Sequence, residues 1–218
     1  MLIQAMTELS LHLGGYFIKL LRTNNIQFVD NTAGMAPKKD LELIEAFRQG
    51  DHSSFNELVR RYQEKVYWIA RRIIGSHEDA DDVIQDVFIR VYDALSDFRA
   101  ESGFYTWLYR ITVNVSLNAL RKKRLKDFVH YEEVEETLES SDEGTDGRIL
   151  KKEYEQILKQ AIERLPPKQK AVFMMRYYDE LSYVEMATIL DKSVGGLKAN
   201  YFHAVKKIQA YVRSEWGR

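Results

Sequence analysis

The sequence predicts an all-α protein built from two small helical domains joined by a flexible acidic linker. Apolar residues recur at steps of three and four positions along most of the chain, which is the spacing of one face of an α-helix. Only three of the 218 residues are proline, and few stretches alternate apolar and polar residues as a strand does. Between His130 and Gly147 eight residues are acidic and none is Lys or Arg. This self-repelling segment separates two groups of helices.

The composition excludes several classes of protein. There is no cysteine, so disulfides and cysteine metal sites are ruled out. The longest apolar stretch, from Leu9 to Leu21, is interrupted by polar residues and is too short to span a bilayer. It also lacks the charged start and cleavage site of a signal peptide. We therefore expect a cytoplasmic protein without membrane insertion.

Residues 1–35 match nothing that follows in the chain. They mix short apolar runs with asparagines and a glycine, and Met35 stands just before a clear helix start. We expect Met35 to be the natural start codon and the preceding segment to be a loosely ordered extension. An amphipathic appendage is the alternative.

The first domain is predicted over residues 36–126. Asp40 is placed to cap a helix that ends at Gly50, and Ser53 or Ser54 opens a longer one that ends at Gly75. A third helix, over residues 77–95, has a valine-rich buried stripe and a face lined with aspartates. This face lacks the Glu-x-x-His spacing of helical metal sites, so we predict no metal there. Docking of a basic partner protein is favoured, with plain solvation as the alternative.

The segment from Phe98 to Lys126 combines aromatic and cationic residues. One helical face is apolar, and the opposite face carries hydrogen-bond donors that include Arg110, Asn114 and Arg121. Aromatic rings can stack unpaired bases at roughly 1–3 kcal/mol each, while the donors contact phosphates and base edges. This pattern suits a nucleic acid whose strands are open. The alternative is an ordinary aromatic core followed by a solvated basic helix end.

A linker is predicted over residues 127–148 and a second domain over residues 149–214. One amphipathic helix stops at Pro166, and a short helix follows to Tyr177. Ser182 and Glu185 have capping-box spacing, and Ser193 caps a further helix after a tight turn. This is the signature of a helix-turn-helix.

The last helix presents a basic face suited to a major groove. From position 192 to position 213 there are five Lys or Arg residues and no acid. Each good base contact contributes roughly 1–3 kcal/mol of discrimination. The outward residues are Lys198, Ala199, Phe202, His203 and Lys206. A basic bundle helix without DNA contacts is the alternative.

Together these motifs closely resemble the extracytoplasmic-function (ECF) group of sigma-70 RNA polymerase sigma factors, which keep only sigma domains two and four. The resemblance covers residues 40–213. It rests on DADDVIQDVF, similar to the group's polymerase-docking helix; on FYTWLYRITVN, similar to its promoter-melting segment; and on LPPKQKAVFMMRYYDELSYVEMATIL with SVGGLKANYFHAV, similar to its helix-turn-helix.

The resemblance implies a role for each matching position. The residues that would bind the β′ clamp helices of core polymerase are Asp82, Gln85 and Asp86. The residues that would hold the minus-ten element are Tyr105, Trp107, Tyr109, Arg110, Asn114 and Arg121. The residues that would read the minus-thirty-five element are Lys198, Ala199, Phe202, His203 and Lys206. The acidic linker would lie in the RNA-exit path of the polymerase.

The implied function is non-enzymatic: the protein directs core polymerase to promoters and assists their melting. The implied partners are the β and β′ subunits, promoter DNA and an anti-sigma factor, which could hold the protein at the inner membrane. No metal, cofactor or small-molecule substrate is expected.

The sequence departs from the group's pattern in the helix-turn-helix. The group often has arginine at positions 200 and 203, where this chain has Asn200 and His203. Fewer arginines predict fewer phosphate contacts and a flatter salt dependence of promoter binding.

Two other classes of function remain open at this point. A LuxR-type helix-turn-helix regulator would account for the second domain but not for the segment from Phe98 to Lys126. An enzyme acting on nucleic acid would need a supported carboxylate cluster, and the aspartates of residues 79–86 lack supporting ligands.

Overall fold

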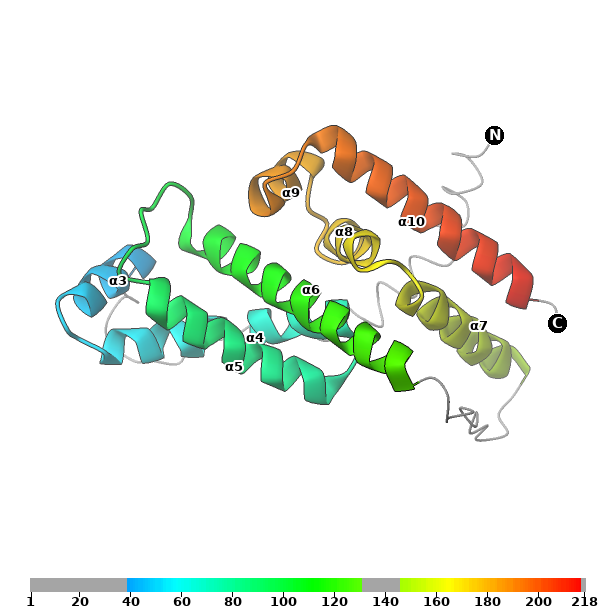
Figure 1. The fold of residues 1–218 in the computed structure, drawn as a ribbon, viewed down its shortest axis with the longest axis horizontal. Helices are drawn as coiled ribbons and strands as arrows, with labels where there is room; N and C mark the ends of the chain where they lie inside the picture. Colours follow the sequence, from blue (N-terminus) through cyan, green and yellow to red (C-terminus); the bar gives the residue numbers. More distant parts are fainter. Residues whose placement is uncertain (1–38, 131–145, 217–218) are drawn as a thin grey trace. The chain divides into compact units, whose positions relative to one another are not determined.

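The computed structural model describes residues 39–130 and 146–216, and these contain helices and no strands. Figure 1 shows their arrangement. The helices are α3 (Asp40–Arg48), α4 (Ser53–Ile74), α5 (His77–Ala94), α6 (Phe104–His130), α7 (Asp146–Glu163), α8 (Pro167–Tyr177), α9 (Tyr183–Leu190) and α10 (Val194–Glu215). The all-α prediction is confirmed. The extension at residues 1–35 lies outside the described residues.

The helices on both sides of the predicted linker are longer than expected. α6 runs on to His130 and α7 begins at Asp146, so helix occupies both ends of the segment 127–148. Residues 127–130 contain neither Gly nor Pro, and nothing in that sequence stops α6 where the basic run ends. The remainder of the linker, residues 131–145, lies outside the described residues.

Local sequence signals set most of the helix ends. Gly75 adopts φ 95° after α4, a left-handed conformation that costs glycine little, and Ser76 then caps α5 by accepting from the Asp79 backbone N–H. The expected Asp40 cap is wrong, because Asp40 is the first residue of α3. Its carboxylate instead accepts a 2.5 Å hydrogen bond from the Tyr62 hydroxyl, which ties α3 to α4.

The first core lies among α3, α4, α5 and α6. The valine stripe of α5 is buried as predicted, with Val87 and Val91 fully enclosed. It packs against Leu58 and Val66 of α4 and Leu108 of α6. These contacts create the bundle that carries the exposed faces of α5 and α6.

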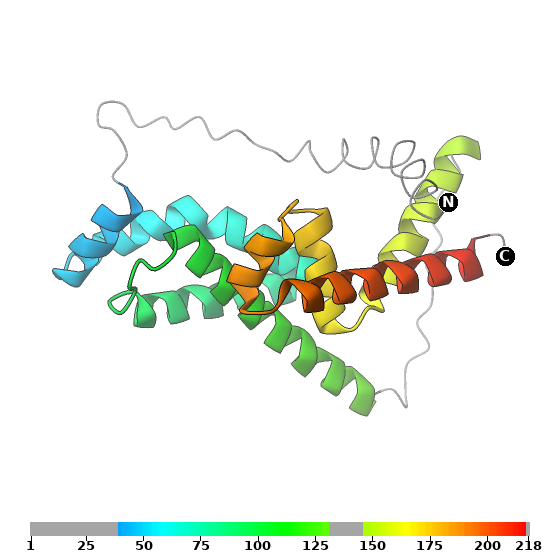
Figure 2. The same cartoon turned by 90° about the horizontal axis from the view of Figure 1, so that it is seen from above.

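A second core joins the two groups of helices. Residues Lys38–Arg218 form one compact unit, in which a second face of α6 packs against α8 and α9. From the first half of the chain this cluster takes Ile69, Ile73, Tyr109, Val113, Leu117 and Leu120. From the second half it takes Ala171, Val172, Met175, Met186, Ile189 and Leu197. We call this the docking cluster; in Figure 2, α8 and α9 lie beside α4 and α6.

The second half also has a core of its own, between α7, α8 and α10. Phe173 of α8 stacks on Tyr201 of α10, with the ring centroids 6.0 Å apart. The buried residues are Ala161, Ile162, Leu165, Phe173, Met174, Ala204 and Ile208. This core holds α10 against α7 and α8, whereas the buried residues of α9, Met186 and Ile189, belong to the docking cluster.

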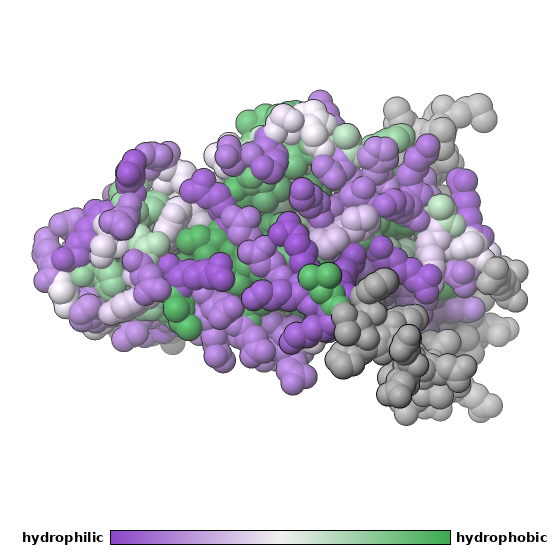
Figure 3. Space-filling model, in the orientation of Figure 1, coloured by the Kyte–Doolittle hydropathy of each residue, from purple (hydrophilic) through white to green (hydrophobic). Residues whose placement is uncertain are grey.

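The face seen in Figure 3 is mostly hydrophilic, with hydrophobic residues in small separate groups. Within residues 39–130 and 146–216, no helix is long and apolar enough to cross a membrane.

Candidate nucleic-acid and partner interfaces

The face of α5 that was predicted to bind a partner is exposed. Asp82, Gln85 and Asp86 are all solvent-accessible, and Ile89 one turn later is 60% exposed. A single exposed apolar side chain is ordinary at a protein surface, so the binding of a partner by this face stays a prediction. The described residues contain no group of three or more His, Cys, Asp or Glu side chains placed to hold a metal.

Asp79, the first aspartate of that stripe, has a different role. Its Oδ2 accepts a 2.6 Å hydrogen bond from Nζ of Lys123, which belongs to α6. This hydrogen bond lowers the pKa of the Asp79 carboxyl group, and the bond from Ser76 adds to the effect. The side chain links α5 to α6, so of the aspartates on this face only those farther along α5 remain candidates for the predicted partner contact.

α6 offers its hydrogen-bond donors on a narrow exposed strip. Asn114, Asn118 and Arg121 are exposed, and Arg121 Nη1 donates to Asn118 Oδ1 at 2.9 Å. Arg110 is half-buried. The strip is narrow because α6 buries two faces, one in each core, whereas the sequence predicted a single apolar face.

The three aromatic residues predicted to hold a base do not lie on one surface. Tyr105 is 39% exposed and stacks on Tyr62, while the Trp107 ring packs against Phe98 with centroids 5.1 Å apart. Tyr109 is only 2% exposed because the docking cluster covers it. The expected aromatic rim is therefore divided between an exposed ring, a half-buried ring and a buried one.

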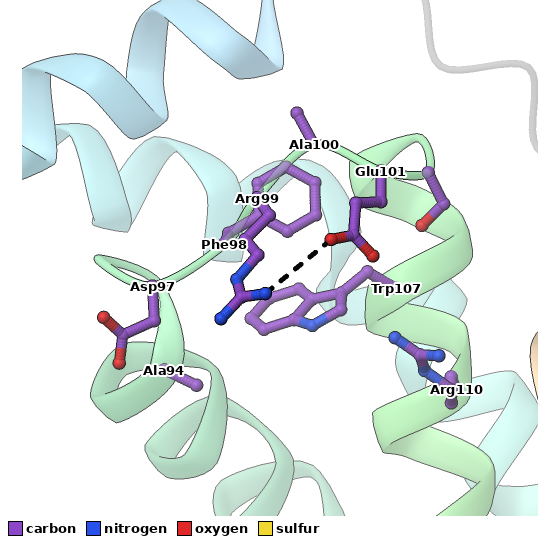
Figure 4. Close-up of a pocket in the computed structure, with 9 residues that line it drawn as sticks. Ala94, Asp97, Phe98, Arg99, Ala100, Glu101, Trp107 and Arg110 are labelled. Atoms are coloured by element: carbon purple, nitrogen blue, oxygen red, sulfur yellow. Dashed lines mark ion pairs between the residues drawn. The ribbon is translucent and has the colours of Figure 1, made fainter.

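A pocket of about 310 Å³ lies where the loop between α5 and α6 meets Trp107 and Arg110. Figure 4 shows the ion pair of Arg99 and Glu101 in front of the Phe98 ring and above Trp107; the two charged groups are 3.9 Å apart. Its lining is Ala94, Asp97, Phe98, Arg99, Ala100, Glu101, Ser102, Trp107 and Arg110.

The loop that lines the pocket is held in place by α3. Arg48 Nε donates to the Ser96 carbonyl at 3.0 Å, and its Nη2 donates to the Phe98 carbonyl. Sequence reasoning included Trp107 and Arg110 but missed Asp97, Arg99, Glu101 and Ser102. The available signal was the short polar run between two helices, directly before the aromatic residues, since loops held by a rigid scaffold often carry binding residues.

The helix-turn-helix forms as its sequence predicted. Ser182 Oγ accepts from the Glu185 N–H at 3.2 Å, and the Glu185 carboxylate accepts from the Ser182 N–H at 2.7 Å. These hydrogen bonds lower the pKa of the Glu185 carboxyl group. Asp191 makes the turn at φ 52°, and Ser193 Oγ caps α10 by accepting from the Gly196 N–H.

The outward face of α10 is exposed while the two halves are packed together through the docking cluster, which we call the docked arrangement. Lys198, Ala199, Phe202, His203 and Lys206 are all exposed, with Phe202 at 57%. Lys198 Nζ lies 5.8 Å from the centre of the Tyr183 ring. Leu197, Ala204 and Ile208 are buried beneath this face, as the spacing predicted.

Asp179 connects the helix-turn-helix half to the first half. Its Oδ2 accepts a 2.6 Å hydrogen bond from the Tyr109 hydroxyl, and its Oδ1 pairs with Arg72 of α4. Burial raises the pKa of the Asp179 carboxyl group, although Arg72 and Tyr109 favour the charged form. Burial also raises the pKa of Tyr109, so this hydroxyl stays protonated as a donor.

Comparisons with known proteins match both halves of the chain. Residues 58–126 match the model of sigma-70 region 2, and residues 155–208 match that of sigma-70 region 4. The ECF RNA polymerase sigma-E factor of Haemophilus influenzae is 36% identical over 178 residues, covering 78% of this chain and 93% of that protein. The ECF RNA polymerase sigma-E factor of Escherichia coli K12 is 38% identical over 183 residues, covering 80% of this chain and 94% of that protein.

A solved structure shares the fold. The sigma factor RpoE of Bartonella quintana, determined in complex with the anti-sigma factor NepR, matches with a TM-score of 0.53 and 20% identity, covering 75% of this chain and 98% of that chain. The sequence relatives align across both helical halves, and this excludes the LuxR-type alternative for the chain as a whole. The chain belongs to the extracytoplasmic-function group of the sigma-70 family of RNA polymerase sigma factors.

Proposed function

We propose that this sigma factor uses three separate surfaces in transcription initiation, one on each of α5, α6 and α10. Members of this family direct core RNA polymerase to promoters. The exposed side chains on the three helices support a separate role for each surface. The observation that carries the proposal is the presence of two different DNA-type surfaces on one chain. These are a capped helix-turn-helix with a basic outer face, and α6, which has exposed donors along its length and contributes Trp107 and Arg110 to a pocket.

The α5 surface would bind the core enzyme. Asp82, Gln85 and Asp86 are exposed beside Ile89 and present carboxylates around an apolar centre. A basic, partly apolar partner such as the β′ clamp helices would complement this face. Charge reversal at Asp86 would therefore weaken core binding without changing DNA binding by the free chain.

The α6 surface would hold the minus-ten element as single-stranded DNA. Asn114 and Arg121 are exposed donors of α6, and the pocket at the start of the same helix is lined by the rings of Phe98 and Trp107 and by polar groups of the loop. This is the chemistry that accepts an extruded base, through stacking and hydrogen bonds to its edge. We place the base in the pocket, with Trp107 as its aromatic wall. Tyr109 would take part only after leaving the docking cluster.

The α10 surface would read the minus-thirty-five element in the major groove. Lys198, Phe202 and His203 are exposed along one side of α10, where they can reach base edges and a thymine methyl group. Ala199 would allow close approach, and Lys206 would contact a phosphate. The role is non-enzymatic, since the core enzyme forms the bonds of the RNA chain.

Regulation by an anti-sigma factor in the cytoplasm fits the same arrangement. The Bartonella quintana sigma factor of similar fold was solved with such a partner. A partner that holds the two halves together would keep Tyr109 covered, and so would oppose use of the α6 surface.

Transcription in vitro would test the proposal. Sigma-free core polymerase and fragmented genomic DNA from the source organism would be incubated with and without the protein, and the transcript starts mapped. Starts that depend on the protein and share two spaced upstream elements are the expected result. Charge reversal at Asp86 should abolish them, whereas charge reversal at Glu153, an exposed residue of α7, should not. If no start depends on the protein, the proposal fails.

A further inference from the structure

A lysine is buried at the junction between the two halves of the molecule. Lys170, in the first turns of α8, is only 2% exposed. Among the described residues it has the largest volume of the fully buried side chains. Its neighbour on the same helix, Lys168, is exposed. A buried ammonium loses its hydration, and this cost must be met by partners.

The ammonium lies against the C-terminal end of α4. A Cβ placed on Gly75 would lie 3.5 Å from Lys170 Nζ and 3.6 Å from Glu163 Oε1, which is ordinary van der Waals contact, so both groups lie directly against Gly75. α4 and α8 belong to different halves. The lysine is therefore enclosed by the packing of one half on the other.

The surroundings of Lys170 are mostly cationic. Arg71 comes from α4, Lys123 and Arg124 come from α6, and Glu163 of α7 is the acid among the groups that act on it. None of the ion pairs in the described part of the chain includes Lys170. Arg124 itself is held by the carbonyls of Glu163 and Leu165, at 2.7 and 2.6 Å, so it cannot move away from the junction without losing both bonds.

We propose that the buried charge of Lys170 destabilises the packing of one half on the other. It opposes the apolar docking cluster, so the two halves can separate more easily. The docking cluster favours the docked arrangement in proportion to its buried apolar surface. Desolvation of the Lys170 ammonium, with three cations near it, works against that gain only when the halves are docked. Because of this opposing cost, a partner would need less free energy to separate the halves than the docking cluster alone would require.

The direction of the pH effect follows from the same geometry. Burial, the largest cause, lowers the pKa of Lys170 from 10.5 to about 8 in the docked arrangement, with Arg124, Arg71 and Lys123 acting in the same direction and Glu163 opposing. The separated halves bind the proton more tightly, so the docked arrangement loses stability as pH falls from 10.5 toward 8. Below that range Lys170 is protonated in both arrangements and the effect is constant. The docking constant is the equilibrium ratio of docked to separated molecules. Each unit of pKa difference between the two arrangements changes it by a factor of about ten.

Energy transfer between two probes would measure docking directly. The chain has no cysteine, so Gln63→Cys on α4 and Ala210→Cys on α10, both exposed positions, give two unique labelling sites. The docking constant is read at a urea concentration where the parent protein is half docked. The comparison is made among the parent protein, Lys170→Met and the matched control Lys168→Met.

The proposal predicts that Lys170→Met raises the docking constant at pH 7 about tenfold or more, and that Lys168→Met leaves it unchanged. Between pH 7 and pH 9 the constant of the parent should rise about tenfold, while that of Lys170→Met should stay flat. Lys170→Gln, which is neutral but polar, should fall between the two, and far-UV circular dichroism verifies that each variant folds. An unchanged or lower docking constant in folded Lys170→Met would overturn the proposal. A pH response that persists in Lys170→Met would do so too. These readouts involve no promoter, so they are independent of the proposed DNA contacts.

Discussion

α6 and α10 are both long helices that carry promoter-binding candidates, yet they bury their residues differently. α10 buries one face, formed by Leu197, Ala204 and Ile208, and leaves the opposite face free. α6 buries two faces, one in the first core and one in the docking cluster, and leaves only a narrow strip exposed. α10 is thus ready for duplex DNA in the docked arrangement. α6 has one candidate, Tyr109, that becomes available only when the halves separate.

The largest expected effect separates the two buried faces of α6. Leu108 lies in the first core and Leu117 in the docking cluster. Leu108→Ala should lower the free energy of unfolding by about 2–5 kcal/mol, because it leaves a cavity in the core of the first half. Leu117→Ala should lower it less but increase the separated fraction. Urea titration followed by circular dichroism and by energy transfer measures both, and equal loss of docking in the two variants would refute the distinction.

A smaller effect is expected at the polar contact that covers Tyr109. Asp179→Ala should weaken docking by about 1–3 kcal/mol, because the Tyr109 hydroxyl and the Arg72 guanidinium would lose their shared acceptor. Energy transfer between the halves is the readout. Asp82→Ala, on the exposed face of α5, is the control and should leave docking unchanged. If the two substitutions act alike, Asp179 does not hold the halves together.

Salt dependence distinguishes the two helices in a different way. Lys206→Ala on α10, which removes the proposed phosphate contact, should reduce the slope of log affinity against log salt by about one when the free chain binds a minus-thirty-five duplex. Asn114→Ala on α6 should leave that slope and affinity unchanged in the free chain and reduce promoter opening only in the holoenzyme. An effect of Asn114→Ala on duplex binding by the free chain would contradict this assignment.

The smallest predicted effect concerns the helix caps. Ser193→Ala removes the side chain that caps α10 and should lower the stability of the second half by about 1 kcal/mol. Ser76→Ala should act similarly on α5 in the first half. Thermal unfolding monitored in each half by a local probe measures the change. A loss that spreads equally to both halves would show that they unfold as one unit.

The helix-turn-helix could be predicted from sequence because its signals are local. Ser182, Glu185, Asp191 and Ser193 act within a few residues of their own positions, and the structure confirms each of them. The outward face of α10 followed from a single helical period, which holds when only one face is buried.

The surface around α6 could not be predicted in the same way, because it depends on contacts between distant segments. Tyr109 is covered by Asp179, which lies 70 positions later, and one helical period cannot reveal a second buried face. The pocket likewise requires Arg48 to hold a loop about 50 positions away. The burial of Lys170 had no local signal, since Lys168 in the same helical turn is exposed.

The most direct test of the account follows energy transfer between probes at Gln63→Cys and Ala210→Cys as partners are added to the labelled protein. A minus-thirty-five duplex should bind through α10 without changing the distance between the halves. Core polymerase with promoter DNA should increase that distance, as Tyr109 leaves the docking cluster. An increase with the duplex alone, or an unchanged distance in the promoter complex, would contradict the claim that docking covers the α6 surface while leaving α10 free.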